Sequence, residues 1–500
     1  MSTEDEALSP KTEKSSPTPQ SSWDRIYTTE ISSCLSYLIF LGFAVTACHV
    51  VLAPIHERNY NASFEETSIL TPQDYASTIY TLGLIIAIGV VTGCVAQLIY
   101  LPSLLAMLLT GIILRNFCES FINVYVINEW SMVLRRIAFI VILLRGGLSL
   151  DANAVRRLKG ACLRLTVLPC TAEICAVALI TKMVFGMDIL FGVALGAVLG
   201  AVSPAVVIPA LLDAGKAGYG VRAGVPSVVI AAASLDDVYA ITVFSLILSL
   251  IFPTGDSPLL TILSAPADVF AGVFCEAMVG FFFHIVPRKT VDNLHFVRLS
   301  LLFSFSLAFL FGTARIRLDG AGAIGVLIAA FVAGHAWKKE GELPEEDYLA
   351  LIWHHVFQPL LFGLIGLELS FGMISLNTML LGVLVLAFGL VFRFTASFFA
   401  VFGSTLTMKE RLFVAIAWMP KATVQAALAP VVLETARSRA SSTSSQIENG
   451  ILILTMAILS ILITAPIGAL AIRLATPVLL KKDEPSEQDD YADEVMLEMN

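Results

Sequence analysis

Two adjacent acids, Asp236 and Asp237, lie in the middle of the stretch 225–252, whose other residues carry no charge. An ionised carboxylate at the centre of a bilayer costs about 3 kcal/mol, so a pair kept there indicates a function. Carboxylate oxygens suit hard cations, and burial beside a like charge favours the protonated form of a carboxyl group. Such a site can hold a proton or a small cation, and binding one expels the other. On a helix the two side chains diverge by about 100°, which predicts different roles.

Two other apolar segments contain proline beside polar residues: Ala-Val-Ser-Pro-Ala at 201–205 and Trp-Met-Pro-Lys-Ala-Thr at 418–423. Proline removes a backbone donor, and freed backbone groups at membrane depth are tolerated only against protein or a wet cavity. One such segment alone is an ordinary kink, but a matched pair indicates a transport site. We therefore expect a cation and proton site formed by Asp236, Asp237, Ala201, Val202, Ser203 and Thr423.

Three further charges lie deep in apolar segments: Lys421, Glu173 and Arg393. We expect Lys421 to compensate charge, either by neutralising the ends of the interrupted helices or by pairing with an aspartate; a snorkelling lysine is the alternative. Glu173 and Arg393 are each costly alone, so we expect them to form an internal ion pair that stabilises the core.

A weak internal repeat relates the two halves of the chain. Gly-Leu-Ser-Leu at 147–150 resembles Gly-Leu-Glu-Leu at 366–369, an offset of 219 residues. Glu173 and Arg393 are 220 residues apart, and Pro204 and Pro420 are 216 apart. Six spans and a linker per copy would invert the second copy, which predicts inverted repeats with two crossed discontinuous helices.

The composition indicates the class of protein to which these segments belong. The 500 residues are 57% hydrophobic and 14% charged, whereas soluble domains carry about 25% charged residues. Apolar runs recur from 31 to 476, which predicts an all-α polytopic membrane protein with about fourteen transmembrane helices. The predicted spans are 31–53, 76–98, 101–116, 134–150, 161–184, 189–212, 225–252, 268–287, 297–314, 320–337, 355–372, 376–402, 411–434 and 450–476.

The remaining residue types exclude other classes of protein. No Cys-x-x-Cys or spaced histidine cluster occurs, so we expect no cofactor and no metal beyond a transported ion. No basic patch interleaved with aromatic residues occurs, so we expect no nucleic-acid partner.

The ends of the chain are polar and divide it into three parts. Residues 1–30 predict a disordered cytosolic N-tail, 31–476 a transmembrane unit, and 477–500 an acidic cytosolic C-tail. Lys and Arg fall mostly in loops on the side of the N-tail, which places both termini in the cytosol. The sequon at Asn61 lies in the outside loop 54–75 and predicts a glycoprotein. The host membrane, plasma or organellar, stays open.

On these motifs the chain resembles the monovalent cation:proton antiporter superfamily over residues 76–476, and most of all the animal NHA-type sodium/proton exchangers. The marks are Asp236 and Asp237 after Ala-Ser-Leu at 233–235, the break at 203–205, and Lys421 after proline. The resemblance implies a homodimer in membrane lipid, with a dimerisation domain to which span 31–53 contributes. It also implies a six-helix core of about 134–252 and 355–476.

The same resemblance implies individual roles. Asp237 would be the indispensable ion ligand with Asp236 beside it. Arg393 stands where bacterial electrogenic members have a lysine, which favours electroneutral exchange.

The predicted function is therefore a secondary active antiporter that exchanges sodium (or lithium) for protons by alternating access and serves pH homeostasis. A sodium-coupled symporter of an organic solute on a related fold is the alternative. An enzyme is not expected: an intramembrane aspartyl protease needs two acids that face each other from different helices, and Gly-x-Gly-Asp is absent. The sequence contains no repeated selectivity-filter segment, so a channel is not expected.

Overall fold

The computed structural model describes residues 71–99, 101–118, 124–149, 159–252, 272, 274, 277–283, 293–315, 319–341, 343–370, 376–438 and 443–482. Several predictions lie outside these residues: the N-tail, the span 31–53, Asn61, most of the span near 268–287, and the acidic tail beyond Lys482. Apart from one isolated bridge between Tyr219 and Lys482, the regular structure of the described residues is helical.

Eight helices among the described residues are long and apolar enough to cross a membrane. They span 72–98, 160–185, 189–215, 228–251, 294–313, 344–368, 376–400 and 444–479, and the shorter apolar helix at 103–117 adds to them. The prediction of a helical, multi-pass membrane protein is confirmed, while the count of about fourteen spans stays a prediction.

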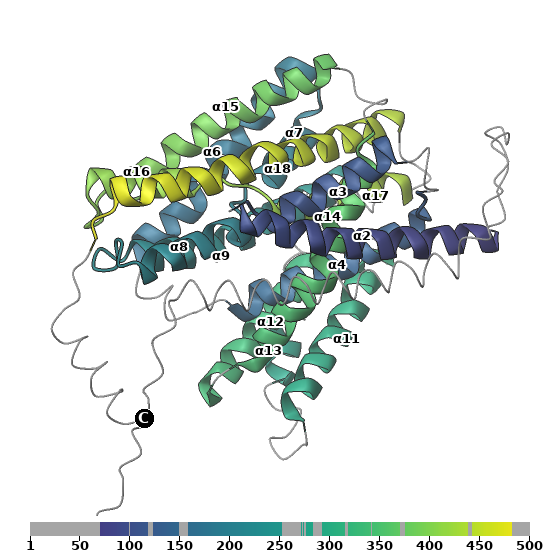
Figure 1. Ribbon diagram of the computed structural model, residues 1–500, viewed down its shortest axis with the longest axis horizontal. Coiled ribbons are helices and arrows are strands. Elements are labelled where there is room, and N and C mark those ends of the chain that lie inside the picture. The colour runs from purple at the N-terminus through teal and green to yellow at the C-terminus, as the bar shows by residue number, and fades with distance from the viewer. Residues whose placement is uncertain are drawn as a thin grey trace, which may run out of the picture.

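One group of helices, here called the core bundle, contains α6 and the helices linked to it through α7, α9 and α15. Its members are α6 (Lys159–Phe185), α7 (Ile189–Gly200), α8 (Pro204–Lys216), α9 (Val225–Ile251), α15 (Leu376–Ala400), α16 (Met408–Ala417), α17 (Thr423–Ser438) and α18 (Ser444–Leu479). α6 packs along α7, α9 and α15, and α18 packs along α16 and α17. Figure 1 shows α15, α16 and α18 together at the top of the molecule.

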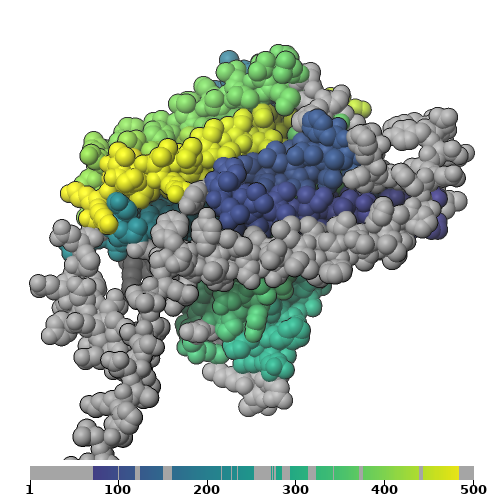
Figure 2. Space-filling view, viewed as in Figure 1, coloured from purple at the N-terminus to yellow at the C-terminus, as the bar shows by residue number. Residues whose placement is uncertain are grey.

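The second group, here called the scaffold bundle, contains the other described helices. These are α2 (Pro72–Leu98), α3 (Ser103–Phe117), α4 (Asn128–Ser149), α11 (Leu294–Arg315), α12 (Asp319–Trp337), η2 (Lys338–Glu340), α13 (Pro344–Ile352), η3 (Trp353–Phe357) and α14 (Gln358–Glu368). In the space-filling view α2 and α3 lie beside α18, and the α11–α13 region lies below them (Figure 2). The bundles meet mainly where α9 packs on α12.

This grouping differs from the predicted core of about 134–252 and 355–476. α4 packs mainly on α12, and α14 mainly on α3 and α2, so the segments 134–150 and 355–372 belong with the scaffold bundle. Glycine explains the close α3–α14 contact: a Cβ added at Gly111 would overlap the carbonyl of Gly363 and lie 2.9 Å from Cα of Gly366. Hydropathy does not show which neighbour such a glycine-lined helix face packs against, so the contacts of these two helices were not predicted, and the boundaries of the six-helix core stay a prediction.

The helix predicted at 355–372 begins eleven residues earlier, at Pro344, and contains the π-helical turn η3 before α14. Its first turn carries Glu345, Glu346 and Asp347, which favour a helix N-terminus but hide it from a hydropathy window. Glu345 is buried and accepts a hydrogen bond from His295 at 3.0 Å, so α11 anchors this start.

Candidate functional site

The two proline segments predicted from the sequence are breaks between half-helices. α7 ends at Gly200, residues 201–203 are extended, and Pro204 opens α8. α16 ends at Ala417, and α17 begins at Thr423. The backbone N–H of Ser203 donates to the carbonyl of Pro420 at 2.9 Å, so the two breaks touch. Proline disfavours helical backbone at the residue before it and clashes with the carbonyl four residues back, so neither helix continues through its proline.

The end of α7 is covered by side chains from the second half of the chain. The last carbonyl groups of a helix have no partner within it and carry the negative end of its dipole. Gln425 donates to the carbonyls of Val198 at 3.0 Å and Ala201 at 2.8 Å. Lys421 donates to the carbonyl of Leu199, and Arg393 to that of Gly200. Four consecutive carbonyls therefore meet three donors, two of them cationic.

Four charged side chains form one buried network beside this helix end. Arg393 Nη1 lies 3.0 Å from Glu173 Oε2, and its Nη2 lies 2.9 Å from Asp236 Oδ2. Lys421 Nζ lies 2.7 Å from Glu173 Oε1. All four side chains are 0% exposed. The two negative and two positive charges balance, and buried side chains stay ionised in a low-dielectric interior only when they are paired in this way.

The two neighbouring aspartates have different surroundings, as their helical spacing predicts. Asp236 Oδ2 accepts hydrogen bonds from Val202 N–H at 2.7 Å and from Arg393. Asp237 is partly buried and lines a cavity of about 870 Å³. Its Oδ1 atom has no hydrogen-bond partner among the described residues. Asp236 is therefore held by the network, whereas Asp237 is a carboxylate in the cavity wall with no ion pair among the described residues.

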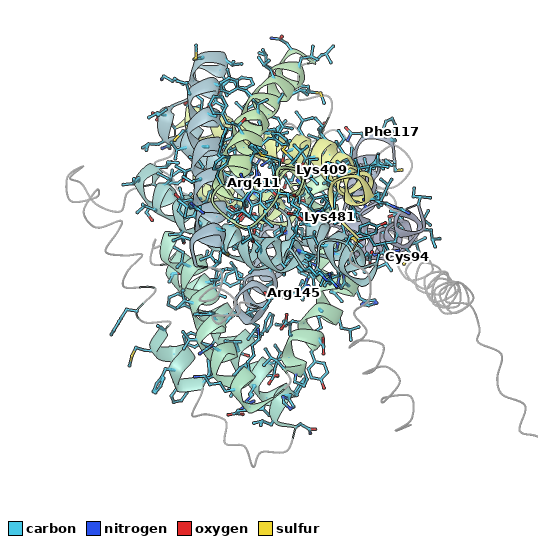
Figure 3. All side chains as sticks on the ribbon, turned by 90° about the vertical axis from the view of Figure 1, so that its left-hand side faces the viewer. Cys94, Phe117, Arg145, Lys409, Arg411 and Lys481 are labelled. Carbon is cyan, nitrogen blue, oxygen red and sulfur yellow. The ribbon has the colours of Figure 1, made fainter. Side chains whose placement is uncertain are left out.

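The cavity lies between the two bundles. The core bundle supplies Asp237, Thr423 and residues of α8 and α18, and the scaffold bundle supplies residues of α3, α4 and η3. Asp213 near the end of α8 and Arg473 near the end of α18 also line it, so the cavity extends toward the end where those helices finish. Seen from that end, Lys409, Arg411 and Lys481 lie on the core bundle and Arg145 lies lower (Figure 3).

The structure places the other predicted site residues as follows. Thr423 lines the cavity with Asp237, and Ser203 Oγ is buried with no hydrogen-bond partner among the described residues. Val202 contributes its N–H to Asp236. The carbonyl of Ala201 accepts a hydrogen bond from Gln425 at 2.8 Å, and its role as an ion ligand stays a prediction.

Of the two alternatives for Lys421, the structure shows its ammonium group at the end of an interrupted helix, where it donates to the carbonyl of Leu199. Lys421 compensates charge, but its ion pair is with Glu173 and not with an aspartate. The reason is that Arg393 already occupies Asp236, while Lys421 approaches from the break beside Leu199. Glu173 and Arg393 do form the expected internal pair.

The sequence reasoning missed a second charged cluster, which joins the bundles at the opposite end of the molecule. Arg135 on α4 binds Glu368 on α14 at 2.8 Å and Glu434 on α17 at 3.0 Å. Arg136 lies 3.4 Å from Glu434. Gln425 was missed as well. One signal was present in the sequence: Glu434 is the last residue of the predicted span 411–434 and Gln425 lies inside it, and a charge or amide at membrane depth needs a partner.

Comparison with known proteins identifies the family. The family model for the transmembrane part of the sodium/hydrogen exchangers matches residues 83–478. The chain belongs to the sodium/hydrogen exchanger family. Sodium/hydrogen exchanger 9B2 of Xenopus tropicalis is 43% identical over 399 residues, covering 78% of this chain and 73% of that protein. Human sodium/hydrogen exchanger 9B2 is 42% identical over 391 residues, covering 78% and 72%.

Further relatives agree with this placement in the exchanger family. Sodium/hydrogen exchanger 9B1 of Macaca fascicularis is 38% identical over 419 residues, covering 82% of this chain and 80% of that protein. The sodium proton antiporter MjNhaP1 of Methanocaldococcus jannaschii has a TM-score of 0.65 at 20% identity, over 81% of this chain and 99% of that structure, and shows the shared fold. The resemblance to the animal NHA-type exchangers inferred from the sequence is confirmed.

Proposed function

We propose that the protein is a secondary active antiporter that exchanges Na⁺ or Li⁺ for H⁺ at Asp237. One observation carries the proposal: Asp237 is the acid of this site that faces the cavity between the bundles and has no ion-pair partner in the described chain. An unpaired carboxylate there gains most by binding a proton or a small cation, and it cannot bind both at once. Thr423 in the same wall supplies a further oxygen.

The charge balance of the site supports electroneutral exchange. Glu173, Asp236, Arg393 and Lys421 sum to zero, so Asp237 carries the uncompensated charge of the cluster. One proton or one monovalent cation neutralises it. If the four paired charges stay as they are, each crossing in either direction moves a neutral site, and one ion is exchanged for one proton.

The geometry also supports alternating access. The positive-inside distribution supports a cytosolic location for the ends of α8 and α18, and in the proposed cycle the cavity is the inward-facing entrance. At the other end, the Arg135–Glu434 pair links the scaffold bundle to the core bundle and closes the outer approach. Opening outward requires the core bundle, with its two interrupted helices, to move against the scaffold bundle and break that pair. We assign dimer formation to the scaffold bundle, together with span 31–53.

The decisive test is transport by the purified protein in liposomes with an imposed pH gradient and the membrane potential clamped. We expect Na⁺ or Li⁺ to release the gradient without net current, and K⁺ is measured in parallel. Asp237→Asn should abolish the signal. Asp188→Asn is the matched control, because Asp188 caps α7 and asparagine caps a helix equally well. Normal exchange by Asp237→Asn, or a requirement for an organic solute, would overturn the proposal.

A further inference from the structure

Gln425 is a buried amide to which neither the proposed exchange nor the predicted site assigns a role. It is the third residue of α17 and is 0% exposed. An amide NH₂ has two hydrogens, and both are used, by the carbonyls of Val198 and Ala201. The opposite orientation would turn the amide oxygen toward two carbonyl oxygens, so the contacts determine which way the amide points.

The carbonyl of Ala201 belongs to the same peptide unit as the N–H of Val202. A trans peptide is planar, and its C=O and N–H point in opposite directions, so turning one turns the other. Gln425 Nε2 binds the oxygen of this unit at 2.8 Å, and Asp236 Oδ2 accepts from its nitrogen at 2.7 Å. One peptide plane therefore connects Gln425 to Asp236.

This connection has a consequence because residues 201–203 are not helical. Within a helix the neighbouring turns would hold the peptide plane, but here the extended break leaves its orientation to side chains. A donor on the carbonyl also polarises the peptide and strengthens its N–H as a donor. Without Gln425, Asp236 would keep Arg393 and lose the N–H.

We propose that Gln425 is a positioning residue that holds the peptide between Ala201 and Val202 toward Asp236 and so sets the cation affinity of the neighbouring Asp237. This deepens the proposed exchange and rests on it. Asp236 adds negative potential beside Asp237 as long as it stays ionised, and its N–H partner is one of the two groups that stabilise that charge. Cation affinity falls when this support is removed.

The test uses the full-length protein in liposomes and two shape-matched variants, Gln425→Met and Gln425→Glu, neither of which keeps the two N–H donors. Gln446→Met is the control, since Gln446 belongs to the capping box that starts α18, away from the site. We expect both Gln425 variants to raise the half-saturating Na⁺ concentration about tenfold, equivalent to about 1.4 kcal/mol, while the maximal rate stays within about twofold. The shift of the melting temperature by Na⁺ measures binding without turnover and should shrink in parallel.

Each outcome either supports the positioning role of Gln425 or overturns it. Unchanged half-saturation with a lower maximal rate would show a structural role and overturn the proposal. Failure of both Gln425 variants to fold, while Gln446→Met folds, would also overturn it, because Gln425 would then be a folding residue. If the wild-type protein moves no protons in response to Na⁺, the proposed function itself is refuted. That measurement is made before any variant is compared, so the two failures are distinguishable.

Discussion

Replacing Glu173 with glutamine should destabilise the protein by about 3–5 kcal/mol, the range seen when one member of a buried ion pair is removed. Glu173 is the acid between two cations: Lys421 Nζ at 2.7 Å and Arg393 Nη1 at 3.0 Å. At an effective dielectric constant near 20 these distances correspond to gross attractions of about 6 and about 5.5 kcal/mol. Desolvation of the carboxylate offsets much of this sum, which is why the expected net loss is smaller.

The same arithmetic predicts rescue by a second substitution. Glu173→Gln combined with Lys421→Gln leaves the pair of Arg393 and Asp236, at 2.9 Å, and restores neutrality. The double variant should lose about 1–2 kcal/mol, because neutral hydrogen bonds replace charged ones. Unfolding in mixed detergent micelles, followed by circular dichroism, measures each variant.

Glu173→Gln combined with Arg135→Gln is the control for energetic coupling, because Arg135 shares no ion-pair partner with Glu173. Those two losses should add within about 0.5 kcal/mol. If Glu173→Gln and Lys421→Gln also add within that margin, the charge-balance reasoning is refuted.

Further predictions concern the ion, the outer closure and the packing. Asp237→Asn should abolish Na⁺-dependent stabilisation against heat while the protein still folds, and an undiminished shift would contradict its role as the ligand. Glu434→Gln should loosen the outer closure, because it removes the negative charge 3.0 Å from Arg135. Cysteines introduced beside Arg135 should then be modified faster by a thiol reagent. Unchanged labelling would argue against a closure. Gly111→Ala should cost about 1–3 kcal/mol because its Cβ would meet α14, whereas Gly312→Ala, with open space around it, should be neutral or stabilising; equal melting temperatures would refute the packing argument.

The sequence predicted the charged residues of the site, because a charge at membrane depth has a high free-energy cost. A charge within an apolar span is expensive wherever it ends up, so Asp236, Asp237, Glu173, Arg393 and Lys421 were found without coordinates. Their partners were harder to predict. Pairing depends on which helix faces meet, and Lys421 reached Glu173 because the break beside Leu199 brings it there.

The division into bundles could not be read from the sequence for a related reason. Hydropathy is the same for a helix that packs on the core bundle and one that packs on the scaffold bundle. What separates them is shape, such as the absence of side chains at Gly111 and Gly363, and this becomes visible only when the helices are placed against each other. Gln425 escaped notice because a lone amide carries no charge.

The four charges of the buried network come from far apart in the chain, and synthesis delivers them in order. Asp236 meets Arg393 across 157 residues, and Glu173 meets Lys421 across 248. The acids emerge from the ribosome first, so a nascent chain that ends before Arg393 holds two carboxylates at membrane depth without a counter-cation. A truncated product therefore carries buried acids whose charge no partner balances, so the network can be completed only after the second half of the chain has been inserted.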